Sequence, residues 1–88
     1  DGMIVSNEPG YYKEGAFGIR IENLVYIKKN KFEELTVAPI EKDLINKKIL
    51  NKIEIKWING YHKKVRKSLS KFMNFQEKTD LTKACSPI

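Results

Sequence analysis

The spacing of hydrophobic residues changes once along the chain, from a period of two residues to a period of nearly four. Residues 3–7 form a short apolar run, and residues 18–28 alternate between two faces in the way of a strand. One of these faces carries Ile19, Ile21, Val25 and Ile27. A polar turn at residues 28–31 then allows residues 32–37 to return as a third strand. The first part of the chain is therefore predicted to form antiparallel strands.

The segment between the first two strands is rich in glycine and aromatic residues. Pro9 and Gly10 suit the central positions of a type II turn, where proline fixes φ and glycine accepts a positive φ. Gly15 and Gly18 allow the backbone to pass close to its neighbours. We therefore expect the chain to turn at residues 9–10 and then to make a glycine-rich excursion.

The second part of the chain has the pattern of one long amphipathic helix. Asn51 and Glu54 have the spacing of a capping box, and Gly60 is a weak point in the helix interior. The apolar stripe behind this cap consists of Ile53, Trp57, Tyr61, Val65, Leu69 and Phe72. Residues 77–84 can add a short helix. The predicted fold class is α+β, with antiparallel strands followed by a long amphipathic helix.

The net charge of +6 is unevenly distributed over the 88 residues. Residues 1–27 have a net charge of −2, whereas residues 28–88 have a net charge of +8. Lysine outnumbers arginine by 15 to 2, and arginine is the residue favoured for phosphate and base recognition. A solvated basic face opposite a packing stripe explains this pattern, so nucleic acid is disfavoured as a partner. A small basic module that binds nucleic acid or an acidic surface stays open as an alternative.

Several classes of protein are excluded by what the sequence lacks. It has no signal-peptide pattern and no apolar stretch long enough to cross a membrane, so we expect a cytoplasmic protein without a membrane partner. Cys85 is the single cysteine, which excludes an internal disulfide, and we expect it to be inert. His62 is the single histidine, and its place beside the apolar stripe favours a structural role.

Two glutamates in the strand-rich part are candidates for a functional site. Glu8 follows the first strand and Glu22 lies in the second, so antiparallel pairing can bring the two carboxylates together. Such an arrangement is costly unless a cation neutralises it, and either Arg20 or a divalent metal ion would serve. The spacing also allows two unrelated surface glutamates. From these residues alone, the three interpretations stay open.

The segment DGMIVSNEPGYYKEGAFGIRIENLVYI resembles the last metal-ligand region of aminopeptidase P, a family of Xaa-Pro aminopeptidases in the creatinase and methionine aminopeptidase superfamily. In that family, one metal-binding glutamate lies in an EPG(Y)Y element and the final, bridging glutamate lies in a GIRIEN element. The resemblance implies that Glu8 binds one metal ion and that Glu22 bridges two. Arg20 matches an arginine whose expected role is charge balance and positioning.

The resemblance continues to the C-terminus through LTVAPIEKDLI, WINGYHKKV and KACSPI. It implies the C-terminal portion of a pita-bread fold, with residues 1–37 as a metal-ligand segment of the catalytic domain and residues 38–88 as its helical region. His62 falls within the helix motif, which again implies a structural role.

The activity that the resemblance implies is removal of an N-terminal residue that precedes proline, with two divalent metal ions, usually manganese, as cofactors. The two aspartates and the histidine that complete the family's ligand set are missing from this sequence, so we expect a fragment that is inactive alone. An upstream fragment of the same enzyme would complement it. An inactive relic of a split gene and a homo-oligomer are also open.

Overall fold

The computed structural model describes residues 2–88, which divide into two compact units. The first unit ends at Thr36 and contains only strands and their connections. The second begins at Val37 and contains only helices and their connections. The change in hydrophobic period along the sequence therefore coincides with a change in secondary structure.

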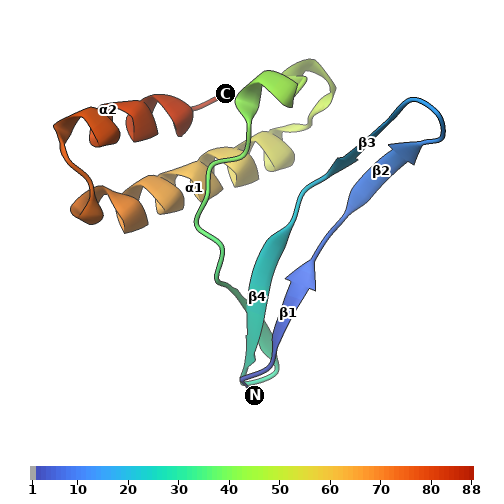
Figure 1. Ribbon diagram of the computed structural model, residues 1–88, viewed down its shortest axis with the longest axis horizontal. Helices are drawn as coiled ribbons and strands as arrows, with labels where there is room; N and C mark the ends of the chain where they lie inside the picture. The colour runs from blue at the N-terminus through green and yellow to red at the C-terminus, as the bar shows by residue number, and fades with distance from the viewer. Residues whose placement is uncertain (1) are drawn as a thin grey trace. The chain divides into compact units, whose positions relative to one another are not determined.

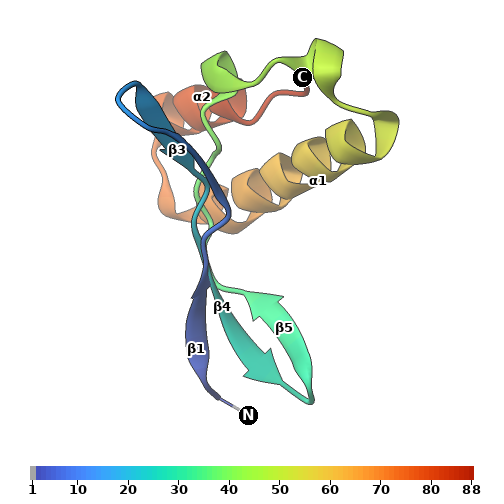
Figure 2. The ribbon, with the colours of Figure 1, turned by 90° about the vertical axis from the view of Figure 1, so that its right-hand side faces the viewer.

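The strands of the first unit form one three-stranded sheet and one two-stranded hairpin. In the sheet, β4 lies between β1 and β5, and all pairs are antiparallel (Figure 2). The hairpin pairs β2 with β3 (Figure 1). The bounds are β1 Ile4–Asn7, β2 Gly10–Lys13, β3 Phe17–Arg20, β4 Asn23–Lys28 and β5 Lys31–Glu34.

The reversal of the chain occurs at Gly15, not at Pro9 and Gly10. Gly10 begins β2, and its φ is not positive, so the predicted type II turn at this pair was wrong. Gly15 has a φ of +70°, and the Ala16 N–H donates to the Lys13 carbonyl to close the turn. A backbone φ in this region favours glycine, which explains why this position carries one.

The predicted long strand over residues 18–28 is interrupted at Ile21 and Glu22, between β3 and β4. The turn predicted at residues 28–31 is confirmed, with Lys28 paired to Lys31. Lys29 and Asn30 at its centre have φ values of 52° and 61°. Positive φ at both central residues is the geometry that matches the twist of a two-residue hairpin.

The helical unit contains two α-helices, α1 Lys52–Leu69 and α2 Phe75–Ala84. Three short 3₁₀ helices accompany them, at Lys42–Leu44, Lys47–Ile49 and Ser70–Phe72. Asn51 caps α1 as predicted, because its Oδ1 accepts a hydrogen bond of 2.8 Å from the Glu54 N–H. Asn74 and Glu77 form a full capping box that starts α2, two residues before the predicted segment. Both helix starts therefore follow from local side-chain chemistry.

The core of the helical unit is formed where the middle of α1 meets the end of α2. It consists of Tyr61, Val65, Leu81 and Cys85, with Ile40, Leu69 and Met73 packed against it. The predicted stripe is buried only at its centre, since Ile53 is 81% exposed and Phe72 is 76% exposed. Cys85 is buried, and this burial raises the pKa of its thiol. A neutral buried thiol acts as a small apolar side chain.

The chain before the first 3₁₀ helix is attached to α1 by two adjacent side chains. The Tyr61 hydroxyl donates to the Ala38 carbonyl at 2.7 Å. The Ile40 N–H donates to His62 Nε2 at 3.0 Å, and His62 is fully buried. These contacts agree with a structural role for His62. Among the described residues, no helix is both long enough and apolar enough to span a membrane.

Candidate metal centre

The register of the strands places Glu8 directly opposite Glu22. Asn7 pairs with Asn23 and Gly10 pairs with Arg20, so the same register continues through the two positions between them. The Ile21 N–H donates to the Pro9 carbonyl at 3.0 Å, which holds the strands together across this interval. Residues opposite each other in an antiparallel pair point to the same face. The two carboxylates therefore share one face of the hairpin.

Arg20 lies on the same face and contacts both glutamates. Its Nη1 lies 3.3 Å from Glu8 Oε1, and its Nε lies 3.7 Å from Glu22 Oε2. These side chains are between 38% and 52% exposed, so each ion pair contributes little to folding stability. The guanidinium nevertheless supplies the countercharge that two adjacent carboxylates need.

Ser6 also contacts the site, and its role was not predicted from the sequence. Its hydroxyl donates to Glu8 Oε2 at 2.6 Å. This hydrogen bond lowers the pKa of Glu8, and the positive charge of Arg20 lowers it further. Both contacts favour the ionised carboxylate of Glu8, which is the form that binds metal ions. A serine two residues before a strand-end glutamate is too common to predict this contact.

The glycines near the site make room for an aromatic ring. Tyr12 pairs with Gly18, and its ring lies across the hairpin. A Cβ atom on Gly18 would lie 2.6 Å from Tyr12 Cδ1, and one on Gly10 would lie 2.9 Å from the Tyr12 hydroxyl oxygen. Contacts this short force the ring to move. The two glycines therefore permit Tyr12 to cover the backbone next to Arg20 and the two glutamates.

Comparison with protein families assigns both units of the chain to one family. Residues 28–88 match the family described as the C-terminal region of peptidase_M24, and residues 1–29 match metallopeptidase family M24. The chain belongs to metallopeptidase family M24. The resemblance that the EPG and GIRIEN elements indicated is thereby confirmed.

Within the M24 family, the chain is similar to proteins named aminopeptidase P. The chain is 44% identical over 81 residues to "Probable Xaa-Pro aminopeptidase P" of Coprinopsis cinerea, which covers 78% of the chain and 13% of that relative. It is 42% identical over 82 residues to "Aminopeptidase P2" of Arabidopsis thaliana, covering 80% of the chain and 12% of that relative. The chain thus spans about an eighth of the length of these relatives.

The fold comparison agrees with the family assignment. The crystal structure of X-prolyl aminopeptidase from Caenorhabditis elegans, a cytosolic enzyme with a di-nuclear active site, superposes with a TM-score of 0.76 and 33% identity. The match covers 97% of this chain and 16% of that enzyme. The predicted fold class is confirmed: an α+β C-terminal portion of the pita-bread fold of M24 metallopeptidases.

Glu8 and Glu22 are suitable in kind as ligands for a hard or borderline divalent metal ion, but they are too few to complete its coordination. Two opposed carboxylates offer oxygen ligands of the kind that Mg²⁺ and Mn²⁺ bind. Within residues 2–88, however, no three His, Cys, Asp or Glu side chains are grouped closely enough to hold a metal ion. The M24 chain therefore presents a pair of donors on one face, and a closed coordination shell requires further ligands.

Proposed function

We propose that this M24 chain supplies two ligands, Glu8 and Glu22, to the di-nuclear metal site of an Xaa-Pro aminopeptidase. The observation that carries the proposal is the pairing of these two carboxylates across the hairpin, with Arg20 contacting both. The likeness to an enzyme with a di-nuclear active site supports it. Carboxylate oxygens are ligands for divalent metal ions, and a pair of this kind could hold both ions of such a site.

Each residue of the site has a distinct proposed role. Glu22 would hold both metal ions, and Glu8 would hold one of them. The Ser6 hydroxyl holds one Glu8 oxygen at 2.6 Å, which limits rotation of the carboxylate. Arg20 balances the negative charge of the pair and positions it. When bound, two divalent ions lower the pKa of a water molecule and make it a nucleophile.

The proposed substrates are peptides with proline at the second position, from which the complete enzyme removes the first residue. Manganese is the proposed metal, and the cytoplasm is the proposed compartment, as for the cytosolic C. elegans enzyme. We propose that the 88-residue chain has no turnover by itself, since two carboxylates leave most of a metal ion's coordination shell to water.

Metal titration of the 88-residue chain tests the ligand assignment. Electron paramagnetic resonance follows the free Mn²⁺ signal as the protein is added. Weak binding is expected, and it should be lost in Glu8→Gln and in Glu22→Gln, because an amide carries no negative charge. Glu14→Gln is the matched control, since Glu14 lies in the turn between β2 and β3. Equal loss in the control, or unchanged binding in both site variants, would refute the assignment.

The same preparation tests the proposal that the chain is inactive alone. An Xaa-Pro peptide is incubated with the pure chain and Mn²⁺, and release of the first residue is measured by mass spectrometry. No release is expected above the rate without protein. Metal-dependent release that disappears in Glu22→Gln would show that the chain is a complete catalyst.

A further inference from the structure

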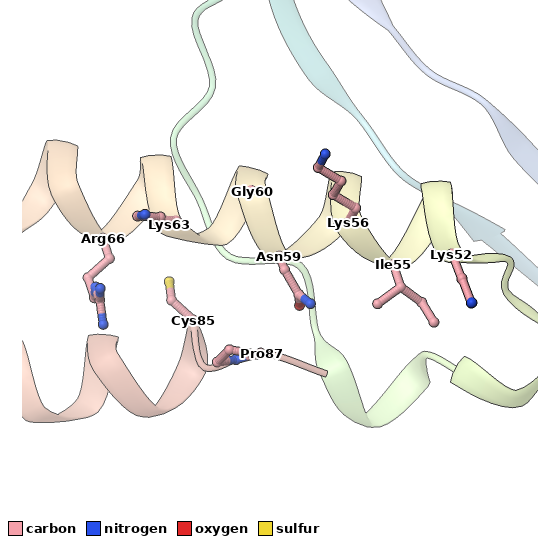
Figure 3. Close-up of a pocket in the computed structure, with 9 residues that line it drawn as sticks. All are labelled: Lys52, Ile55, Lys56, Asn59, Gly60, Lys63, Arg66, Cys85 and Pro87. Atoms are coloured by element: carbon pink, nitrogen blue, oxygen red, sulfur yellow. The ribbon is translucent and has the colours of Figure 1, made fainter.

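A basic groove runs along one side of α1 in the helical unit. It has a volume of about 640 Å³ and lies between the helix and the C-terminal segment that includes Cys85 and Pro87 (Figure 3). Its lining consists of Lys52, Ile55, Lys56, Asn59, Gly60, Lys63, Arg66, Cys85 and Pro87. We call this feature the basic groove. None of these residues belongs to the proposed metal centre.

The basic groove carries positive charge toward both of its ends. Four of its nine lining residues are cations on α1, and none is acidic. Their spacing of four, seven and three residues starts them on one side of the helix, although the Lys56 side chain turns away from the groove (Figure 3). Their side chains are exposed, and no ion pair found within residues 2–88 involves them. The basic groove therefore presents unneutralised charge to solvent.

The base of the groove is neutral and open. Gly60 lies on α1, and a Cβ atom added there would meet no atom within 4 Å. Asn59 extends toward Pro87 in Figure 3, and its Oδ1 accepts a hydrogen bond of 2.9 Å from the Ile88 N–H. The same figure shows Lys52 and Arg66 extending to this side, whereas Lys56 is turned the other way. The amide NH₂ of Asn59 supplies a polar donor between the cations.

The length of the groove favours an extended ligand over a small anion. Lys52 and Arg66 are fourteen residues apart, which corresponds to about 21 Å along an α-helix. A single small anion cannot contact both ends. An extended peptide advances about 3.3 Å per residue, so about six residues would span this distance. None of the lining residues is aromatic, so the groove offers no platform on which nucleic-acid bases could stack.

We propose that the basic groove binds an acidic segment of a partner polypeptide in an extended conformation. The carboxylates of that segment pair with Lys52, Lys63 and Arg66, and its backbone carbonyls accept from the Asn59 amide. Cations toward both ends of the groove favour a partner whose negative charges are spread along its own length. The proposal concerns residues of the helical unit alone, and it holds whether or not the metal assignment does.

A labelled hexaglutamate peptide tests the proposal by fluorescence anisotropy with the full 88-residue chain, at low salt and at about 0.15 M salt. Hexaglutamine is the neutral control peptide. The groove variant is Lys52→Gln, Lys63→Gln and Arg66→Gln together. The matched control is Lys47→Gln, Lys48→Gln and Lys67→Gln, which removes the same charge outside the groove. Because each exposed pair contributes modestly, we expect the groove variant to bind about tenfold more weakly and the control to change less than about twofold.

Three results would overturn the proposal. One is an equal loss of hexaglutamate affinity in both triple variants, which would show that net charge alone explains the binding. Another is the absence of saturable binding at about 0.15 M salt. The third is binding of hexauridylate as tight as that of hexaglutamate with the same groove dependence, which would make the ligand nucleic acid. Amide chemical shifts give a second readout in the unsubstituted chain: hexaglutamate should perturb Asn59, Gly60 and Lys63, and perturbations confined to other residues would contradict the proposal.

Discussion

Replacement of Tyr61 by phenylalanine isolates the contact that attaches the start of the helical unit to α1. The Tyr61 side chain is 5% exposed, and its ring belongs to the core. Its hydroxyl donates to the Ala38 carbonyl at 2.7 Å and accepts from the Ala38 N–H at 3.4 Å. Phenylalanine keeps the ring and removes only these hydrogen bonds. The measured change in the free energy of unfolding therefore reports on them and not on lost apolar burial.

The structure sets the size of the expected effect. The 2.7 Å bond has normal geometry, whereas 3.4 Å is longer than an ordinary N–H···O hydrogen bond, so one bond dominates. Ala38 is exposed, and water can replace the hydroxyl at its carbonyl. The loss should therefore be the net value of a hydrogen bond, about 1 kcal/mol, without the added penalty for a buried unpaired group.

Denaturant unfolding followed by circular dichroism at 222 nm measures this loss. Tyr26→Phe is the matched control, since Tyr26 lies in β4 and no hydrogen bond of its hydroxyl is found in residues 2–88. It should change stability by no more than a few tenths of 1 kcal/mol. Amide exchange should also become faster at Ile40, two residues beyond the lost contact. A Tyr61→Phe variant as stable as Tyr26→Phe, or one destabilised by more than about 3 kcal/mol, would refute the reasoning.

Two further predictions concern α1. Burial lowers the pKa of His62, and the positive charge of Lys42 lowers it further, so the unfolded chain binds the proton more readily. Stability should be full above the unfolded pKa of about 6.5 and should fall as pH decreases below it, and His62→Gln should flatten that slope in denaturant titrations at several pH values. Gly60→Ala should stabilise the chain by about 0.5–1 kcal/mol, because the added methyl group meets open space and alanine favours the helix. A lower unfolding midpoint in Gly60→Ala would contradict this.

Local patterns in the sequence predicted the elements whose ends depend on local chemistry. Asn51 caps α1 because its side chain reaches the Glu54 N–H without help from the rest of the fold. The turn at residues 28–31 forms because two adjacent residues adopt positive φ. The turn predicted at Pro9 and Gly10 was wrong because strand pairing outweighed the local preference of these two residues for a turn. The pairs that flank them, Asn7 with Asn23 and Gly10 with Arg20, share one register, so the chain continues straight through.

Burial along α1 could not be predicted from its periodicity, because the length of the partner helix sets it. α1 has 18 residues and α2 has 10, which correspond to about 27 Å and about 15 Å. The shorter helix covers Tyr61 and Val65 but leaves Ile53 exposed at the start of α1 and Phe72 exposed in the 3₁₀ helix that follows α1. The candidate metal centre also depends on features that spacing does not fix. Spacing allowed Glu8 and Glu22 to meet, but the position of the Tyr12 ring depends on a cross-strand register known only from the structure. The Ser6 contact depends on the side-chain conformations of two residues that lie two positions apart.

The two units differ in how firmly they hold their functional side chains. The helical unit has a core of its own, whereas Val25, at 7% exposed, is the one buried apolar residue found in the strands within residues 2–88. Apolar side chains of β2 and β3, including Tyr11 at 63% and Phe17 at 52%, are exposed. Exposed apolar surface of this extent marks a face that packs against other polypeptide. Because the chain spans only 16% of the C. elegans enzyme, the remainder of such an enzyme can supply that cover. The positions of the proposed ligands Glu8 and Glu22 would then be fixed by that packing, since their ion pairs with Arg20 are too exposed to fix them alone.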